Sequence, residues 1–187
     1  EYIHHHKSSN VNQRELGKDT GRNLAEVFDR VNNHDPDVLV ISNVKDTFMV
    51  ETAVLAAQKG ILVIVGLNAI DVFSAIEQLI STLSDEYMKA LFSRSLLAAF
   101  AQRLVWSKSS KKRVLIWEHL LGTPRIQKYI RDDKIYYIKG QATSLKGEYF
   151  PIEESLAKAV KSGLLSGESI LMEPWINQDV LRIYLER

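Results

Sequence analysis

The sequence predicts an α/β fold with a mostly parallel sheet flanked by helices, followed by a smaller, mainly helical segment. Short aliphatic runs alternate with segments of helical periodicity up to about residue 120, which is typical of strands and crossover helices in parallel sheets. Beyond that point the pattern becomes mainly helical. In addition, 45% of the 187 residues are hydrophobic and 25% are charged, which is ordinary for a chain that forms a core.

The first half of the chain contains the clearest strand and helix signals. Its predicted elements, in order, are a helix at 20–33, a strand at 38–41, a helix at 46–59 and a strand at 61–65. Asp19 offers an N-cap side chain to the first helix, and Gly60 is a suitable C-cap for the second. Both strand segments are continuous aliphatic runs, as in parallel strands that are buried on both faces. We therefore expect them to be neighbouring parallel strands.

The next segments are predicted from apolar spacing and from a basic turn. They are a helix at 72–83, a long helix from Ser84 to about Leu104, a serine-rich basic turn at 107–113 and a strand at 114–117. The long helix is predicted from apolar residues at helical spacing, namely Met88, Leu91, Phe92, Leu96 and Ala99. The basic turn is interpreted as a solvated loop in preference to a partner-binding patch.

The last third of the chain is predicted to be mainly helical. Helices are expected at 124–132, 152–162, 167–172 and 178–185. Residues 136–138 fit a strand or a helical turn equally well, and the sequence does not decide between them.

Several classes of site are absent from the sequence. No cysteine occurs, so disulfides, thiolate metal sites and cysteine nucleophiles are excluded. None of the nine glycines is followed by another glycine five positions later, so the phosphate-binding loop G-x-x-x-x-G-K-[ST] is missing, and so is G-x-G-x-x-G. The net charge of +1 does not indicate a nucleic-acid partner, and no apolar run approaches the roughly 18 residues of a membrane span.

Three consecutive histidines near the start of the chain are a candidate for a metal site. His4 and His6 could share one side of a strand, but a solvated polar stretch explains them better, so no metal is predicted. The chain begins at Glu1 without a methionine, and we expect that it is a piece of a longer protein.

Five collinear stretches resemble the type IV pilus retraction ATPases of the PilT type and the related type II and IV secretion ATPases. The stretches are Val11–Thr20, which resembles V-x-Q-R-E-V-x-x-D-T; Asp35–Asp46, which is similar to the Walker B segment D-P-D-x-I-x-x-G-E-x-R-D; Ala56–Gly60; Gly122–Asp132, which resembles G-T-P-A-I-R-N-L-I-R-E; and the closing segment Glu153–Ser166. Their common order and spacing cover nearly the whole chain.

The resemblance implies a RecA-like fold of the P-loop NTPase type. Residues 1–120 would be the C-terminal part of the core, and residues 121–187 a helical subdomain, with the phosphate-binding loop upstream of Glu1. It also implies ATP and Mg²⁺ as cofactors, or none for this chain, and a homo- or hetero-oligomeric ring, expected to be a hexamer. The implied partner is an inner-membrane platform protein of a pilus or secretion system, the implied location is cytoplasmic and peripheral to the inner membrane, and no nucleic acid is involved.

The chain departs from the family pattern at the chemical positions. The Walker B glutamate falls on Asn43 and the following arginine on Lys45, while the histidines of the family's His box fall on Ile61 and Asn68. An amide can hydrogen-bond a water molecule but cannot accept its proton, and a positioned general base is worth roughly a hundred- to ten-thousand-fold in rate. The simpler reading is that both asparagines are turn residues.

These departures lead to one main hypothesis and two alternatives. The main hypothesis is a catalytically degenerate motor subunit; the alternatives are an active retraction motor that is completed by upstream residues, and a protein-binding module that has lost nucleotide. Five charged residues are candidates for interface or motor-coupling positions, although each also fits an ordinary surface charge: Arg14, Asp19, Lys45, Arg125 and Arg131.

Overall fold

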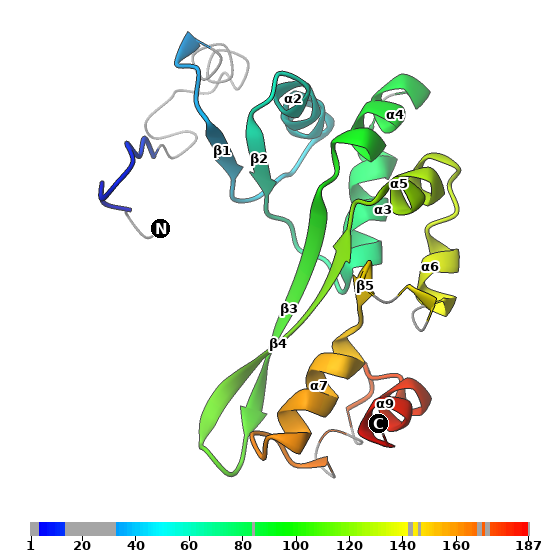
Figure 1. Cartoon of the computed structure of the whole chain (residues 1–187). Helices are drawn as coiled ribbons and strands as arrows, with labels where there is room; N and C mark the ends of the chain where they lie inside the picture. Colours follow the sequence, from blue (N-terminus) through cyan, green and yellow to red (C-terminus); the bar gives the residue numbers. More distant parts are fainter. Residues whose placement is uncertain are drawn as a thin grey trace.

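The computed structural model describes residues 4–13, 33–83, 85–141, 144–145, 147–167, 170 and 173–186. Its elements (Figure 1) are β1 (Val38–Ile41), α2 (Thr47–Gln58), β2 (Leu62–Val65), α3 (Val72–Thr82), α4 (Glu86–Ser95), β3 (Ala98–Ser107), β4 (Lys112–Leu121), α5 (Pro124–Arg131), α6 (Tyr136–Gly140), β5 (Tyr149–Phe150), α7 (Ile152–Lys161) and α9 (Gln178–Glu186). None of the described helices is both long and apolar enough to cross a bilayer. The helix predicted at 20–33 lies almost entirely outside the described residues.

Strands β1 and β2 are parallel neighbours joined by α2, as the sequence predicts. Their register pairs Val38 with Leu62 and Ile41 with Val65. Helix α2 begins where the Asp46 carboxylate accepts a hydrogen bond from the Met49 N–H group at 2.9 Å. The chain then turns into β2 through Gly60, whose φ of 93° lies in the left-handed region that favours glycine.

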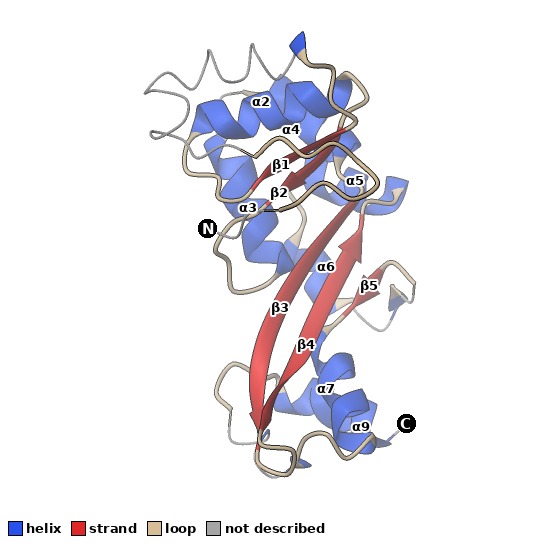
Figure 2. Ribbon diagram, turned by 90° about the vertical axis from the view of Figure 1, so that its left-hand side faces the viewer, coloured by secondary structure: helices blue, strands red, loops and turns tan. Residues whose placement is uncertain are grey.

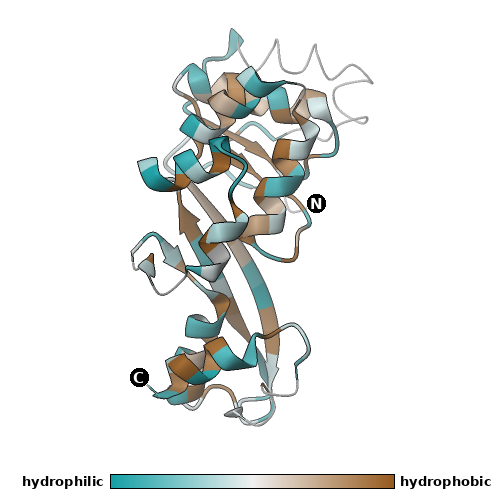
Figure 3. Ribbon diagram, turned by 90° about the vertical axis from the view of Figure 1, so that its right-hand side faces the viewer, coloured by the Kyte–Doolittle hydropathy of each residue, from teal (hydrophilic) through white to brown (hydrophobic). Residues whose placement is uncertain are grey.

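The expected burial of β1 and β2 on both faces is wrong for the described structure. Alternate side chains along the two strands stay about half exposed: Val38 at 47%, Val40 at 62%, Leu62 at 46% and Ile64 at 51%. The reason is that α2 packs against β2, and no described element covers the opposite face. The helices in Figure 3 show both hydrophobic and hydrophilic residues, as expected of helices with one buried side.

The long helix predicted from Ser84 to Leu104 is wrong in its second half. Helix α4 ends at Ser95, Leu96 adopts an extended conformation, and residues 98–107 form β3, which pairs with β4 as an antiparallel hairpin. Alanine, leucine, glutamine and arginine favour helices intrinsically, but pairing with β4 overrides that preference. The predicted basic turn is confirmed as the connection of this hairpin, with Lys111 at a φ of 51°.

The strands after β2 form a sheet of their own. Strand β4 pairs with β3 on one side and with the short β5 on the other, so all these pairings are antiparallel. Among the described strands, parallel pairing is therefore confined to β1 and β2.

The predicted helices of the C-terminal third are largely confirmed. Helices α5, α7 and α9 occupy the expected segments, and Thr123 caps α5 with Pro124 in its first turn. Residues 136–138, which the sequence left open, belong to the short helix α6. The helix expected at 167–172 lies mostly outside the described residues, and the boundary between residues 120 and 121 stays a prediction.

The hairpin of β3 and β4 links two hydrophobic clusters. The first cluster combines buried residues of α2 to α6 with Leu120 of β4, and Ala99 and Ala101 of β3 pack against it. The second combines α7 and α9 with Ile116 of β4, and Val105 packs against it. Both views show the hairpin extending from the α2–α5 end of the molecule to the α7–α9 end (Figures 1 and 2).

Candidate functional site

The candidate site is the edge at which β1 and β2 end. Parallel strands place their carboxyl ends at the same edge, which is where open α/β sheets bind ligands. Two backbone hydrogen bonds hold the following loops together: the Val44 N–H group donates to the Gly66 carbonyl at 3.0 Å, and the Gly66 N–H group donates to the Ile41 carbonyl at 2.8 Å. The two loops are therefore hydrogen-bonded to each other where they leave the strands.

Both asparagines that replace family catalytic residues lie at this edge. Asn43 follows the last residue of β1 by two positions, and Asn68 follows the last residue of β2 by three. Both side chains are exposed, as is that of Lys45 in the same loop. The edge thus brings together three of the seven residues singled out in the sequence; their roles stay predictions.

Close packing of the two loops depends on the absence of a side chain at Gly66. A Cβ atom at this position would lie 2.5 Å from the Ser42 carbonyl oxygen and 3.1 Å from its carbon, inside the contact distance of real atoms. Because the obstacle is backbone rather than a flexible side chain, one of the loops would have to move.

We expect Gly66→Ala to destabilise the protein by about 1–3 kcal/mol, the usual cost of overpacking. Chemical denaturation measures this change, and Gly167→Ala is the control, since its Cβ would meet only Val160 at an ordinary 3.8 Å. Equal unfolding free energies of the two variants would contradict the close approach.

The aspartates of these loops are engaged as helix caps. Asp46 caps α2, and Asp71 caps α3 by accepting a hydrogen bond from the Ser74 N–H group at 2.8 Å. The Ser74 hydroxyl in turn accepts from the Asp71 N–H group at 3.0 Å, completing a capping box. In both caps the hydrogen bond from the helix N–H group goes to the Oδ1 atom of the carboxylate.

A buried glutamate on β4, which the sequence analysis did not single out, supports the same edge. Glu118 is 2% exposed; its Oε1 accepts from the Val72 N–H group at 2.8 Å and its Oε2 accepts from the Tyr149 hydroxyl at 3.1 Å. Burial raises the pKa of Glu118, while these two hydrogen bonds oppose the rise. Burial, together with the nearby Glu118 carboxylate, raises the pKa of Tyr149.

Sequence periodicity contains a signal for Glu118. Residues 116, 118 and 120 share one face of β4, and the two neighbours of Glu118 on that face are the fully buried Ile116 and Leu120. A carboxylate at an inward position between two such residues indicates a structural or functional role.

The remaining charged candidates lie away from the edge or outside the described residues. Arg125, in α5, is within 3.6 Å of a Glu148 carboxylate oxygen, and Arg131, near the end of α5, lies 3.8 Å from its neighbour Asp132. Both pairs are partly exposed and contribute little stability. Arg14 and Asp19 are among the residues that the structure does not describe.

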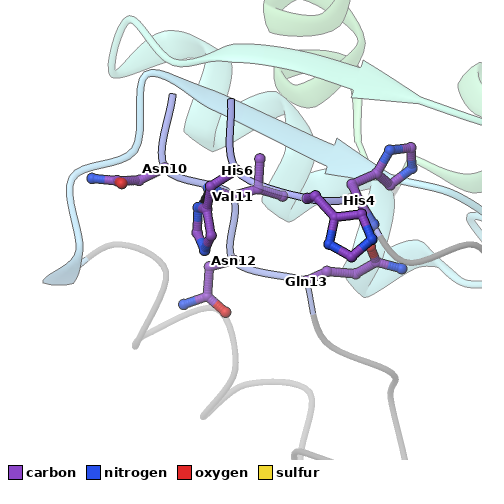
Figure 4. A pocket seen from close by; sticks show the side chains of 7 residues that line it. His4, His6, Asn10, Val11, Asn12 and Gln13 are labelled. Atoms are coloured by element: carbon purple, nitrogen blue, oxygen red, sulfur yellow. Dashed lines mark hydrogen bonds between the residues drawn. The ribbon is translucent and has the colours of Figure 1, made fainter. Parts of the chain in front are cut away.

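The histidine run near the start of the chain does not converge on one point. The His6 Nδ1 atom accepts a hydrogen bond from the Val11 N–H group at 2.9 Å, and the His4 N–H group donates to Gln13 at 3.1 Å. Figure 4 shows the imidazole rings of His4 and His6 well apart. No cluster of three potential metal-ligating side chains occurs among the described residues.

The parallel β1–α2–β2 unit and its edge agree with a RecA-like α/β protein. The profile of the family described as "Type II/IV secretion system protein" matches residues 5–149, so the chain belongs to this family. It is similar to the "Twitching motility protein" of Neisseria gonorrhoeae, with 28% identity over 177 residues, covering 90% of this chain and 46% of the relative. The "Type IV pilus retractation ATPase PilT" of Pseudomonas aeruginosa is 30% identical over 138 residues, covering 72% of this chain and 40% of the relative.

Solved structures confirm the RecA-like α/β class. The pilus retraction motor PilT with bound ADP superimposes with a TM-score of 0.80 and 28% identity, covering 97% of this chain and 52% of PilT. The ATPase DotB of Legionella pneumophila gives a TM-score of 0.73 at 16% identity, over 88% of this chain and 46% of DotB, and supports the fold alone. The chain spans about half the length of the curated relatives it matches.

Proposed function

We propose that this chain is part of a PilT-like motor subunit that is catalytically degenerate. In this proposal it acts in a type IV pilus or secretion system as a ring subunit or as a regulatory partner of an active paralogue. The observation that carries the proposal is the presence of Asn43 and Asn68 at the shared edge of β1 and β2 in a chain of this family.

The chemistry of the edge supports reduced catalysis. Hydrolysis of ATP depends on neutralising phosphate charge and on orienting the attacking water. Asn43 and Asn68 offer amides, which carry no charge and do not take up a proton. Asp46 and Asp71 are engaged as helix caps. With amides at both positions and no phosphate-binding loop in the sequence, this edge does not fit Mg²⁺–ATP hydrolysis by itself, and we derive no hydrolytic step from it.

The proposal includes a place in an assembly. Family resemblance favours a ring, hexameric in the simplest case, that docks on an inner-membrane platform protein from the cytoplasmic side. Lys45, Arg125 and Arg131 are exposed, as residues that contact a neighbouring subunit would be in the isolated chain. Arg14 and Asp19 remain candidates for the same role from the sequence alone.

The test is ATP binding and phosphate release by the purified full-length protein. We expect turnover far below about 1 s⁻¹, the lower end of typical enzyme rates. The double variant Asn43→Glu with Asn68→His restores both family groups, and where ATP binds we expect it to raise phosphate release by roughly a hundred-fold or more.

A matched control adds the same carboxylate at the opposite edge of the sheet. Asn33 is exposed and precedes β1, so Asn33→Glu is expected to leave phosphate release unchanged. Turnover of about 1 s⁻¹ or faster in the unmodified protein would refute degeneracy and establish an active motor. Absence of ATP binding in both the unmodified protein and the double variant would favour a binding module without nucleotide.

A further inference from the structure

Arg103 joins the loop at the candidate site to the C-terminal segment. This residue lies on the inner face of β3, which faces both hydrophobic clusters. Its Nη2 atom donates a hydrogen bond to the Ile70 carbonyl at 3.1 Å, and its guanidinium lies over the Trp175 ring, 4.5 Å from the centroid. Trp175 precedes α9 and is oriented by its own hydrogen bond to Glu173 at 2.9 Å. One side chain therefore contacts two segments that lie far apart in the sequence.

Glu118 makes a second connection of the same kind on the neighbouring strand. One carboxylate oxygen accepts from the Val72 N–H group and the other from the Tyr149 hydroxyl. Tyr149 opens β5, which leads through Pro151 directly into α7. Arg103 and Glu118 thus fix two backbone groups only two residues apart, and their other contacts lead into α9 and α7.

These contacts fix the loop that carries Asn68. The loop runs from Gly66 at the end of β2 to Val72 at the start of α3, and its far end is fixed by the Ile70 carbonyl and the Val72 N–H group. Hydrogen bonds that involve a charged partner are shorter and about twice as strong as neutral ones. The Gly66 hydrogen bond to Ile41 holds the near end of the loop, so both ends of the segment that carries Asn68 are held.

We propose that Arg103 and Glu118 are positioning residues that couple the loop at residues 66–72 to the C-terminal helices α7 and α9. A displacement of the C-terminal helices then changes the order of the candidate site, and a change at the site is transmitted back to those helices. The functional meaning of this coupling rests on the proposed motor-like function, but the coupling itself does not require nucleotide.

The test is amide hydrogen exchange in the full-length protein, without nucleotide. Trp175→Leu removes the ring over Arg103 without touching residues 66–72. We expect amide exchange of residues 66–72 to become about three- to tenfold faster, the range that a cation–π contact supports. Trp175→Phe keeps an aromatic ring and is expected to retain most of the protection of residues 66–72 from exchange. Both variants lose side-chain volume, so a difference between them would indicate that the aromatic ring matters.

Two further variants make the result decisive. Arg103→Met is expected to accelerate exchange both in residues 66–72 and in the segment from 173 to 186. Trp106→Leu is the control, because Trp106 lies on the outer face of the same strand, is 58% exposed and is expected to leave exchange at residues 66–72 unchanged.

The hydrogen-exchange results test the coupling and do not depend on the proposed motor function. Unchanged exchange at residues 66–72 in both Trp175→Leu and Arg103→Met would overturn it. So would an equal acceleration in Trp106→Leu, since that would indicate a general loss of stability. If Trp175→Leu does not fold, Arg103→Met with Trp175→Phe supplies the same comparison. Rapid ATP turnover would refute the degenerate motor and leave this result untouched.

Discussion

Replacing Gly122 with alanine is expected to destabilise the chain by about 3 kcal/mol, at the upper end of the cost of overpacking. A Cβ atom at residue 122 would lie 1.8 Å from the Leu96 carbonyl oxygen and 2.6 Å from its carbon. No rotamer change relieves this clash, because the obstacle is backbone. The Gly122 N–H group also donates to the Leu97 carbonyl at 2.7 Å, so a displacement would break the closure of the hairpin at the end of β4.

Urea denaturation of Gly122→Ala against Gly140→Ala measures this effect. Gly140 ends α6 and has no atom within 4 Å of the position of an added Cβ. The control is therefore expected to be neutral or to gain up to about 1 kcal/mol from the better helix propensity of alanine. A change below about 1 kcal/mol in Gly122→Ala would show that the two segments are not in close contact.

Replacing Glu118 with alanine is expected to cost about 3 kcal/mol. The substitution leaves the Val72 N–H group and the Tyr149 hydroxyl without their acceptor inside the protein, and an unsatisfied buried polar group costs about 1–3 kcal/mol. Glu118→Gln is the matched control, because its amide oxygen keeps an acceptor at nearly the same place. Unfolding free energies measured at one pH separate the two variants, and an equal loss in both would mean that the charge rather than the acceptor matters.

The unmodified protein and Glu118→Gln are expected to differ in the pH dependence of their stability, with a defined sign. Burial raises the pKa of Glu118 above its ordinary value of 4.5, so the native state binds this proton more tightly than the unfolded state. The contribution of the carboxyl group to the free energy of unfolding is then complete below pH 4.5 and falls as the pH rises through the native pKa. Glu118→Gln lacks this titration. We expect the stability of the native protein relative to Glu118→Gln to decline as the pH rises above 4.5, and an opposite slope would contradict the raised pKa.

The parallel unit of the fold was predictable because its local signals agree. Two aliphatic runs flank a helical pattern, and Gly60 stands at the required left-handed turn. The hairpin was not predictable by the same means, since residues 98–107 contain good helix formers and continue the apolar spacing of α4. Only pairing with β4, a nonlocal interaction, makes this segment a strand.

The residues of the candidate site also differ in whether the sequence alone identifies them. Asn43 and Asn68 were identified because motifs are local, and the edge they occupy follows from the strand order. Arg103 and Glu118 were missed because their partners lie 33 and 46 residues away in the sequence, respectively. Helical periodicity assigned at residue 103 also concealed the inward direction of its side chain, which only a two-residue repeat would indicate.

The shared hairpin has a consequence for how this chain melts. Strands β3 and β4 have ten residues each, a length of about 33 Å, and each contributes side chains to both hydrophobic clusters. Neither cluster can lose its packing without fraying a strand that the other one needs. Thermal and chemical denaturation of the described core should therefore proceed as a single cooperative transition, with a calorimetric enthalpy equal to the van't Hoff value.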